Sequence, residues 1–293
     1  MEAPLDVLIR TAGGRPALLA RAIASVVGQQ GVRARAIIVT VGSASDPVLE
    51  APSDDRVVVH RLAHAASPGR ALSLARRLVE APFYAFLDDD DELLPNALSI
   101  RLQRLVDEHA DAVVTTGYWI SNETQRIHIP DIGRHQGDLL NGIVERCWLA
   151  SCGGLFRASS VSARHFDDLP DLCEWTCVAF RLALARAKLR LLDVPTYNVY
   201  DTAGSLSKSD AFEDATLRLL SAMRAERLPS SVREKLERKY RAALHDAAER
   251  YRRARNLRKA WHCHLRSIKP PHTLRYGAYT RKLLWRAGGA ADF

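Results

Sequence analysis

The stretch Phe83-Tyr84-Ala85-Phe86-Leu87-Asp88-Asp89-Asp90-Asp91 decides the fold of this chain. Its first five residues are apolar and mostly aromatic, which is typical of a strand buried on both faces. Four aspartates then end the strand abruptly. We therefore predict a buried strand over residues 83–87 whose carboxyl end carries four neighbouring carboxylates.

The segments around this strand alternate between strand and helix patterns. Strands are predicted over residues 6–11, 36–41, 56–60 and 112–116, and helices over residues 18–27, 69–80 and 95–109. This alternation is typical of an α/β fold with a mostly parallel sheet sandwiched by helices. Ligands of such sheets bind at the carboxyl ends of the strands. Thr11 and the aspartate run both lie at predicted carboxyl ends, so we expect them to share a site.

The composition changes after about residue 210, where charged helical patterns replace strand patterns. We predict an α/β domain over residues 1–208 and a helical, basic C-terminal extension over residues 209–293. The last segment interleaves Arg and Lys with Leu, Tyr and Trp, which is typical of a helix that lies on an anionic membrane surface. The alternative is a helix packed on the protein's own surface.

The 293-residue chain has a formal net charge of +8, which fits phosphorylated ligands, an anionic membrane surface or nucleic acid. No nucleic-acid-binding signature accompanies the charge, so a nucleic-acid partner is not expected. The sequence contains no apolar run long enough to span a membrane and no signal peptide, which predicts a cytoplasmic protein. The five cysteines lack the tight spacing of structural zinc sites, which favours buried free thiols.

The aspartate run predicts a divalent cation. Adjacent carboxylates repel one another, and a hard cation such as Mg²⁺ or Mn²⁺ removes that repulsion through oxygen ligands. The cation would also carry a diphosphate and stabilise it as a leaving group. The alternative is a solvated acidic loop that caps the next helix, but five apolar residues directly before the run favour the metal.

Three segments of the chain resemble an inverting glycosyltransferase of family 2 with the GT-A fold. Val7-Leu8-Ile9-Arg10-Thr11, followed by Arg15-Pro16, resembles the first strand and turn of that family. Phe86-Leu87-Asp88-Asp89-Asp90-Asp91 with Pro95 is similar to its D-x-D-D element, and Gly153-Gly154-Leu155-Phe156-Arg157 to the segment before its acceptor-side carboxylate. The resemblance covers roughly residues 5–208.

The resemblance implies transfer of a sugar from a nucleotide-diphosphate donor to an acceptor hydroxyl, with Mn²⁺ or Mg²⁺ as cofactor. It also implies a glycan or lipid-linked acceptor, synthesis of a cell-envelope or surface polysaccharide, and peripheral attachment to an anionic membrane surface. The implied nucleotide-sugar ligands are Thr11, Arg76, Asp88 and Asp89, and the implied metal ligands are Asp90 and Asp91. The division of roles among the four aspartates stays open, and the alternative for Arg76 is a solvated helix face.

Glu174 stands where the family has its general base, the group that takes the proton of the attacking acceptor hydroxyl. The alternative is an ordinary acid at the start of a helix, where it favours the helix dipole.

Two segments of the chain each allow two interpretations. The family's usual second-strand aspartates are replaced by Thr40-Val41-Gly42-Ser43, with Asp46 displaced, so the alternative function is a catalytically degenerate nucleotide-sugar-binding module. Residues 202–208 fit either a loop that closes over a diphosphate or a plain polar linker. A nucleotidyltransferase is disfavoured because the usual glycine-rich phosphate loop is missing.

Overall fold

The computed structural model of the protein describes residues 4–40, 54–62, 66–121, 124–201, 209–268 and 276–285. The chain divides into two compact units, Met1–Ser205 and Leu206–Phe293. The predicted domain boundary after residue 208 lies outside the described residues, as do Val41–Ser43, Asp46 and the segment 202–208.

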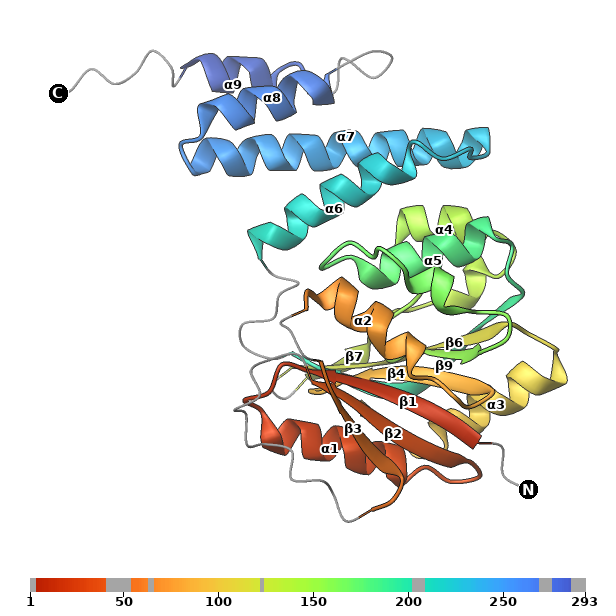
Figure 1. Ribbon diagram of the computed structural model, residues 1–293. Helices are drawn as coiled ribbons and strands as arrows, with labels where there is room; N and C mark the ends of the chain where they lie inside the picture. Colours follow the sequence, from red (N-terminus) through yellow and green to blue (C-terminus); the bar gives the residue numbers. More distant parts are fainter. Residues whose placement is uncertain are drawn as a thin grey trace. The chain divides into compact units, whose positions relative to one another are not determined.

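One sheet forms the centre of the first unit (Figure 1). Its described strands lie in the order β3-β2-β1-β4-β8-β6-β9-β5, and β7 pairs with β6. The strands are β1 Pro4–Thr11, β2 Arg33–Thr40, β3 Val57–Arg61, β4 Phe83–Asp88, β5 Glu92–Leu93, β6 Ala112–Ser121, β7 Thr124–Ile127, β8 Gly154–Arg157 and β9 Leu189–Tyr200. The first four strands are parallel to one another, and β6 is parallel to β9. Because β8 is antiparallel to both β4 and β6, those two strands run in the same direction.

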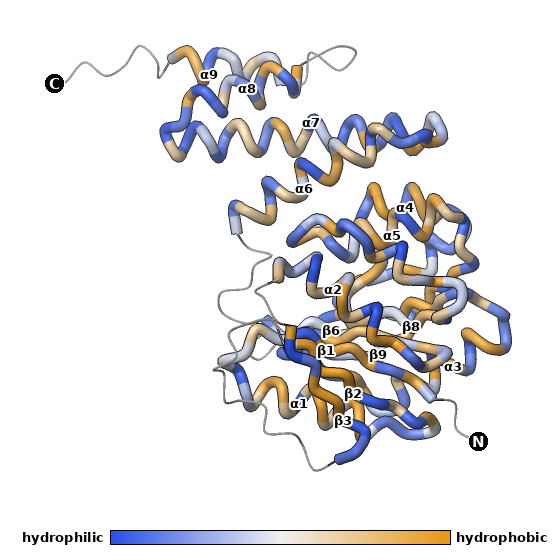
Figure 2. Tube along the Cα trace, in the orientation of Figure 1, coloured by the Kyte–Doolittle hydropathy of each residue, from blue (hydrophilic) through white to orange (hydrophobic). Residues whose placement is uncertain are grey.

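The central strands are nearly continuous runs of buried apolar residues. In β1, Leu5, Val7, Leu8 and Ile9 are each at most 1% exposed. Such continuous burial requires cover on both faces of the sheet, since a half-exposed strand would alternate between apolar and polar residues. Figure 2 shows the resulting concentration of hydrophobic residues along β1 and β2.

Helices supply that cover on both faces (Figure 1). The helices of this unit are α1 Pro16–Val27, α2 Pro68–Arg77, α3 Ala97–Asp107, α4 Leu139–Glu145 and α5 Glu174–Leu184, with 3₁₀ turns η1 Ile132–His135 and η2 Ala163–Phe166. α1 lies on one face, and α2, α4 and α5 lie on the other. Gln29 ties α3 to the α1 side, because its side-chain oxygen accepts a hydrogen bond from the Leu98 backbone N–H. The predicted mostly parallel sheet sandwiched by helices is confirmed.

Aromatic rings from β4, β8, η2 and α5 pack together on one face of the sheet. Tyr84 and Phe86 lie two residues apart in β4 and therefore point to the same face. They contact Phe156 of β8 and Phe166 of η2, with ring centroids 5.2 Å apart for Tyr84–Phe156 and 5.3 Å apart for Phe86–Phe166. Trp175, the second residue of α5, meets Phe86 edge-on at 5.1 Å. This cluster fixes the start of α5 over the carboxyl end of β4.

The second unit is helical in its described part. Its helices are α6 Asp210–Met223, α7 Ser230–Arg253, α8 Leu257–Ser267 and α9 Tyr279–Trp285. Leu219, Leu236 and Leu244 are buried in its core, and Arg250 of α7 forms ion pairs with Glu213 and Asp214 of α6. The predicted C-terminal helices are present. Among the described residues, no helix has both the length and the apolar character that crossing a bilayer requires.

Candidate active site

The carboxyl ends of β1 and β4 lie side by side, because Arg10 pairs in register with Asp88. This pairing brings Thr11 to the aspartate run, as the sequence predicted. The Thr11 hydroxyl donates a hydrogen bond of 2.5 Å to Oδ2 of Asp89 and accepts one of 3.0 Å from the Gly13 backbone N–H. Thr11 therefore ties the first loop of the chain to the acidic turn.

The four aspartates form a turn in which two side chains are buried and two reach solvent. The backbone N–H of Asp91 donates to the Asp88 carbonyl at 3.2 Å, which closes the turn. Asp89 and Asp91 are each 3% exposed, whereas the side chains of Asp88 and Asp90 are 34% and 18% exposed. Only the second pair is therefore open to an incoming ligand from the solvent side.

Asp91 fixes the turn through contacts on its buried side. Its Oδ1 accepts a hydrogen bond of 3.1 Å from the Tyr200 backbone N–H, and its Oδ2 accepts a long contact of 3.8 Å from the Cys152 thiol. Burial raises the pKa of the Asp91 carboxyl well above its usual range, and the neighbouring charges of Asp88 and Asp90 add to the rise. Its contacts join the turn to the ends of β9 and the segment before β8.

Arg15 bridges the carboxylates of Asp89 and Asp90. Its Nη2 lies 2.6 Å from Oδ1 of Asp89, and its Nη1 lies 2.6 Å from Oδ2 of Asp90. Burial raises the pKa of Asp89, while Thr11 and Arg15 act in the opposite direction. The Arg21 guanidinium, whose carbon lies 3.8 Å from the centre of the Tyr200 ring, donates to the Asp90 carbonyl.

Glu174 lies at the same edge of the sheet as the acidic turn, on the face that α5 covers (Figure 1). It is the first residue of α5 and is 7% exposed. Arg10 lies between two carboxylates, with its Nη1 3.6 Å from Oε1 of Glu174 and its Nη2 3.7 Å from Oδ1 of Asp88. Burial raises the pKa of Glu174; backbone hydrogen bonds and the Arg10 charge oppose that rise. A buried carboxyl with a raised pKa at the edge of an open turn is suited to accepting a proton.

Arg76 is not brought to the carboxylates. Its guanidinium is buried on the α5 side of the sheet, where Nη2 donates to the carbonyls of Val161 at 3.0 Å and Ala158 at 3.1 Å. It also lies 4.3 Å from the centre of the Tyr84 ring. These contacts hold α2 against the segment after β8, and the predicted contact with a nucleotide stays a prediction.

Arg10, Arg15, Arg21 and Tyr200 contact the acidic turn but were not identified as site residues from the sequence. Arg10 and Arg15 belong to the first resembling segment, and the register of β1 on β4 was the signal that could have found Arg10. Tyr200 contributes through its backbone N–H, which no side-chain pattern can reveal.

A divalent cation fits the donor chemistry of the turn. Carboxylate oxygens are the ligands that Mg²⁺ and Mn²⁺ prefer, and Mg²⁺ commonly takes one or two carboxylates together with substrate phosphates. Within the residues that the structure describes, no three His, Cys, Asp or Glu side chains converge as a ready-made metal site. Asp88 and Asp90, the two partly exposed carboxylates, could supply the one or two protein ligands of a cation whose remaining ligands are substrate phosphates.

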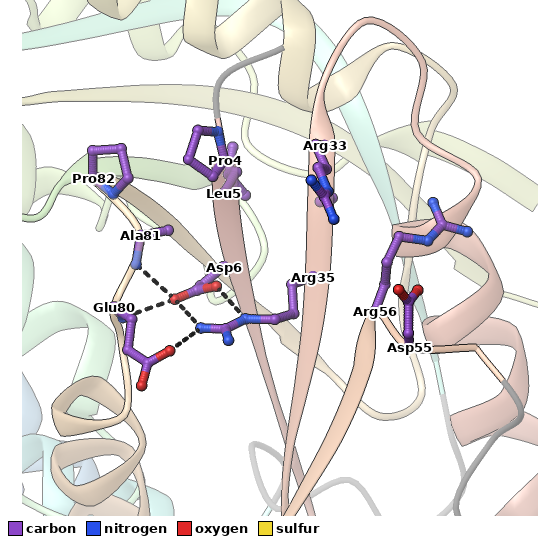
Figure 3. A pocket seen from close by; sticks show the side chains of 11 residues that line it. Pro4, Leu5, Asp6, Arg33, Arg35, Asp55, Arg56, Glu80, Ala81 and Pro82 are labelled. Carbon is purple, nitrogen blue, oxygen red and sulfur yellow. Dashed lines mark hydrogen bonds and ion pairs between the residues drawn. The ribbon is translucent and has the colours of Figure 1, made fainter. Parts of the chain in front are cut away.

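A hollow of about 340 Å³ lies at the opposite edge of the sheet, beside the amino ends of β1 and β2 (Figure 3). It is lined in part by Asp6, a carboxylate that is 1% exposed and accepts hydrogen bonds from Arg35 and from the backbone N–H groups of Glu80 and Ala81. Thr11 lies five positions after Asp6 in β1, which corresponds to about 16 Å along the strand. The hollow is therefore remote from the acidic turn. Asp6 has a structural role, because it connects β1 to β2 and to the segment before β4.

Comparison with known proteins agrees with this geometry. Residues 8–161, more than half of the 293-residue chain, match the family described as glycosyl transferase family 2. The chain belongs to this family. Membership of glycosyltransferase family 2 confirms the sequence-based prediction and identifies the protein as a glycosyltransferase.

Solved structures similar to this family 2 member include fragment 1–349 of S. aureus TarS. The fragment in complex with UDP-GlcNAc is 14% identical, with a TM-score of 0.61, over 96% of this chain and 92% of that one. The complex with UDP is 15% identical, with a TM-score of 0.55, over 84% and 71% of the two chains. At this identity the likeness concerns the fold, and it confirms the predicted GT-A architecture.

One curated relative is a teichoic acid poly(glycerol phosphate) polymerase of Staphylococcus epidermidis. It is 24% identical over 223 residues, which are 67% of this chain and 30% of the relative. The chain thus spans less than a third of the length of that protein.

Proposed function

We propose that this protein transfers a sugar, with inversion, from a nucleotide-diphosphate donor to an acceptor hydroxyl in the synthesis of a cell-wall polymer. The observation that carries the proposal is the convergence of Thr11, the acidic turn and Glu174 at one edge of the sheet, with Arg10 spanning the two carboxylate groups. Residues that could bind the donor and a residue that could act as the general base therefore lie at one site.

Thr11, Asp88 and Asp89 form the donor side. The Thr11 hydroxyl and the buried Asp89 fix the loop that would face the nucleotide, and Asp88 faces solvent beside them. Two similar solved structures are complexes with UDP-GlcNAc and with UDP, so a uridine diphosphate sugar is the first donor to test. Arg76 supports this side indirectly, because its hydrogen bonds to the carbonyls of Ala158 and Val161 hold α2 in place.

Asp90, with Asp88, would hold Mn²⁺ or Mg²⁺, and Asp91 would position the turn from its buried place. When bound, the cation supplies positive charge for the departing diphosphate. The protein contributes the carboxylates of Asp88 and Asp90, on a turn that contacts with Tyr200, Cys152 and Thr11 hold in place.

Glu174 is the proposed general base. As the acceptor oxygen attacks the anomeric carbon, its proton passes to the Glu174 carboxylate and the bond between that carbon and the diphosphate oxygen breaks. The nucleoside diphosphate then leaves with the bonding electrons. Single displacement inverts the configuration of the anomeric carbon, and it needs one base on the side opposite the leaving group.

The acceptor and the place of action form a further part of the proposal. The proposed acceptor is a glycan or lipid-linked wall polymer, and the curated relative is a polymerase of teichoic acid. Leu265 of α8 and Leu284 of α9 are 53% and 58% exposed, and basic residues such as Arg266 and Lys282 lie near them in the sequence. These residues support peripheral attachment of a cytoplasmic protein to an anionic membrane surface.

Transfer and hydrolysis assays with UDP-GlcNAc and other nucleotide-sugars, with and without Mn²⁺, test the proposal. Turnover that requires both Mn²⁺ and Glu174 is expected. Donor binding without turnover for every donor and acceptor tried would instead identify a degenerate binding module. Flotation with anionic and neutral vesicles tests membrane attachment, and equal recovery of protein lacking residues 257–293 would count against it.

A further inference from the structure

Arg15 places a permanent positive charge between two carboxylates of the acidic turn. Its two terminal nitrogens each lie 2.6 Å from an oxygen, one of Asp89 and one of Asp90. A guanidinium stays protonated at any working pH, and its planar fork matches paired oxygens. The turn is therefore partly neutralised by the protein itself.

The loop that carries Arg15 has a backbone set for this contact. Gly13 and Gly14 have φ values of 81° and 76°, a left-handed conformation that residues with a side chain rarely adopt. A Cβ atom at Gly14 would meet no atom within 4 Å, so the conformation and not the available space calls for glycine there. The paired glycines turn the chain between Thr11, which contacts Asp89, and Arg15, which precedes α1.

The two carboxylates that Arg15 contacts differ in their exposure to solvent. Asp89 is 3% exposed and has Thr11 as a second partner. Asp90 has an 18% exposed side chain and is the proposed metal ligand. The Arg15 side chain is itself 43% exposed, so its guanidinium can move toward solvent while its backbone stays at the start of α1.

We propose that Arg15 is a positioning residue that competes with the divalent cation for Asp90 and then binds the diphosphate of the donor. The inference rests on the proposed function. Two positive groups beside one carboxylate repel each other, so Arg15 weakens cation binding in the absence of donor. A diphosphate offers the guanidinium a new pair of oxygens and removes that repulsion, so cation and donor bind cooperatively.

Binding of Mn²⁺ alone, followed by electron paramagnetic resonance in the absence and presence of UDP, tests the inference without an activity assay. For Arg15→Ala we expect Mn²⁺ alone to bind about three- to tenfold more tightly, and UDP to raise Mn²⁺ affinity by a smaller factor than in the unchanged protein. Arg15→Lys keeps the charge but not the fork, so it should retain weak Mn²⁺ binding and lose part of the UDP effect.

Arg33→Ala is the matched control, because it removes one exposed arginine at the amino end of β2, at the opposite edge of the sheet. It should leave both Mn²⁺ affinities unchanged. Arg15→Gln is a second neutral variant of similar length in case Arg15→Ala is poorly folded. Unchanged or weaker Mn²⁺ binding in the neutral variants would overturn the role of Arg15. Equal Mn²⁺ binding by the unchanged protein and Asp90→Ala would instead overturn the proposed metal site.

Discussion

Trp175 packs edge-on against Phe86, with 5.1 Å between the ring centroids, and thereby holds the first turn of α5 over the end of β4. The residue before Trp175 is Glu174, and the residue two positions after Phe86 is Asp88. Residues two apart in a strand point to the same face, so this aromatic contact places the proposed base near the acidic turn.

Trp175→Ala should lower the free energy of unfolding by about 2–3 kcal/mol, somewhat less than for a fully buried tryptophan, because Trp175 is half-buried. It should also lower the transfer rate, since Glu174 loses its support. Urea denaturation and steady-state kinetics provide the two measurements. Trp175→Phe is the control and should keep most of both properties; a fully active Trp175→Ala protein would contradict the positioning role.

Glu174→Gln should reduce the transfer rate by about 10²–10⁴-fold while leaving donor binding unchanged, because only the proton acceptor is lost. Burial raises the pKa of Glu174, and the base must be ionised to work. As the pH is lowered, activity should therefore begin to fall at a higher pH than the ordinary glutamate pKa of about 4.3 would predict. Rates across a pH series check this, and an acid limb that survives in Glu174→Gln would belong to another group.

Thr11→Val should lower the free energy of unfolding by about 1–3 kcal/mol, because the buried Asp89 loses the hydroxyl that donates to it. UDP affinity should fall as the loop loses its tie to the acidic turn. Thr11→Ser retains the hydroxyl and should lie close to the unchanged protein. Thermal melts with and without UDP separate the two effects, and equal behaviour of the Val and Ser variants would exclude this role for the hydrogen bond.

Asp6→Asn should destabilise the fold without affecting donor binding. Asp6 is buried, but its partner Arg35 has a 33% exposed side chain, so we expect a loss of about 1–3 kcal/mol and not the larger loss of a fully buried ion pair. Urea denaturation measures the loss, and UDP titration provides the contrast. Weaker UDP binding by the folded variant would show that the two edges of the sheet are coupled.

His128 should make the protein less stable in acid. Burial, together with the charges of Arg146 and Arg126, lowers the pKa of His128 to about 4 in the folded protein, compared with about 6.5 when unfolded. The unfolded chain binds more protons between these values, so this contribution to stability is complete above pH 6.5 and is lost as the pH falls toward 4. The loss is roughly 3 kcal/mol, and His128→Gln should flatten the slope of unfolding free energy against pH; an unchanged slope would refute the assignment.

The part of the fold from β1 to β6 could be predicted from local patterns, because its parallel strands are mostly apolar runs separated by helices with clear periodicity. β9 is parallel to β6 but was not predicted, because Asp193 and Pro195 interrupt its apolar residues. β8 was missed because Gly154–Arg157 is only four residues long and begins with glycine, which carries no strand signal. The second strand was predicted over residues 36–41 but spans Arg33–Thr40, because alternating arginines at its start hide residues that the sheet buries.

The acidic turn and its approach to Thr11 followed from strand order, which a sequence can suggest. The contacts of Arg15 and of Arg10 did not follow, because they join residues 74 or more positions apart through long side chains whose direction only the packed structure fixes. Arg76 illustrates the reverse case: the family resemblance implied a ligand of the nucleotide, while its observed partners are backbone carbonyls.

β8 has one further consequence for how such a protein can change. A single reversed strand joins the block β1–β4 to the block of β6 and β9, and both blocks end at the same edge of the sheet. The residues that would hold the donor come from the first block and the turn after it. Since β6 and its partner β7 contribute none of these residues, substitutions in that hairpin can accumulate while the residues proposed to hold the donor stay unchanged.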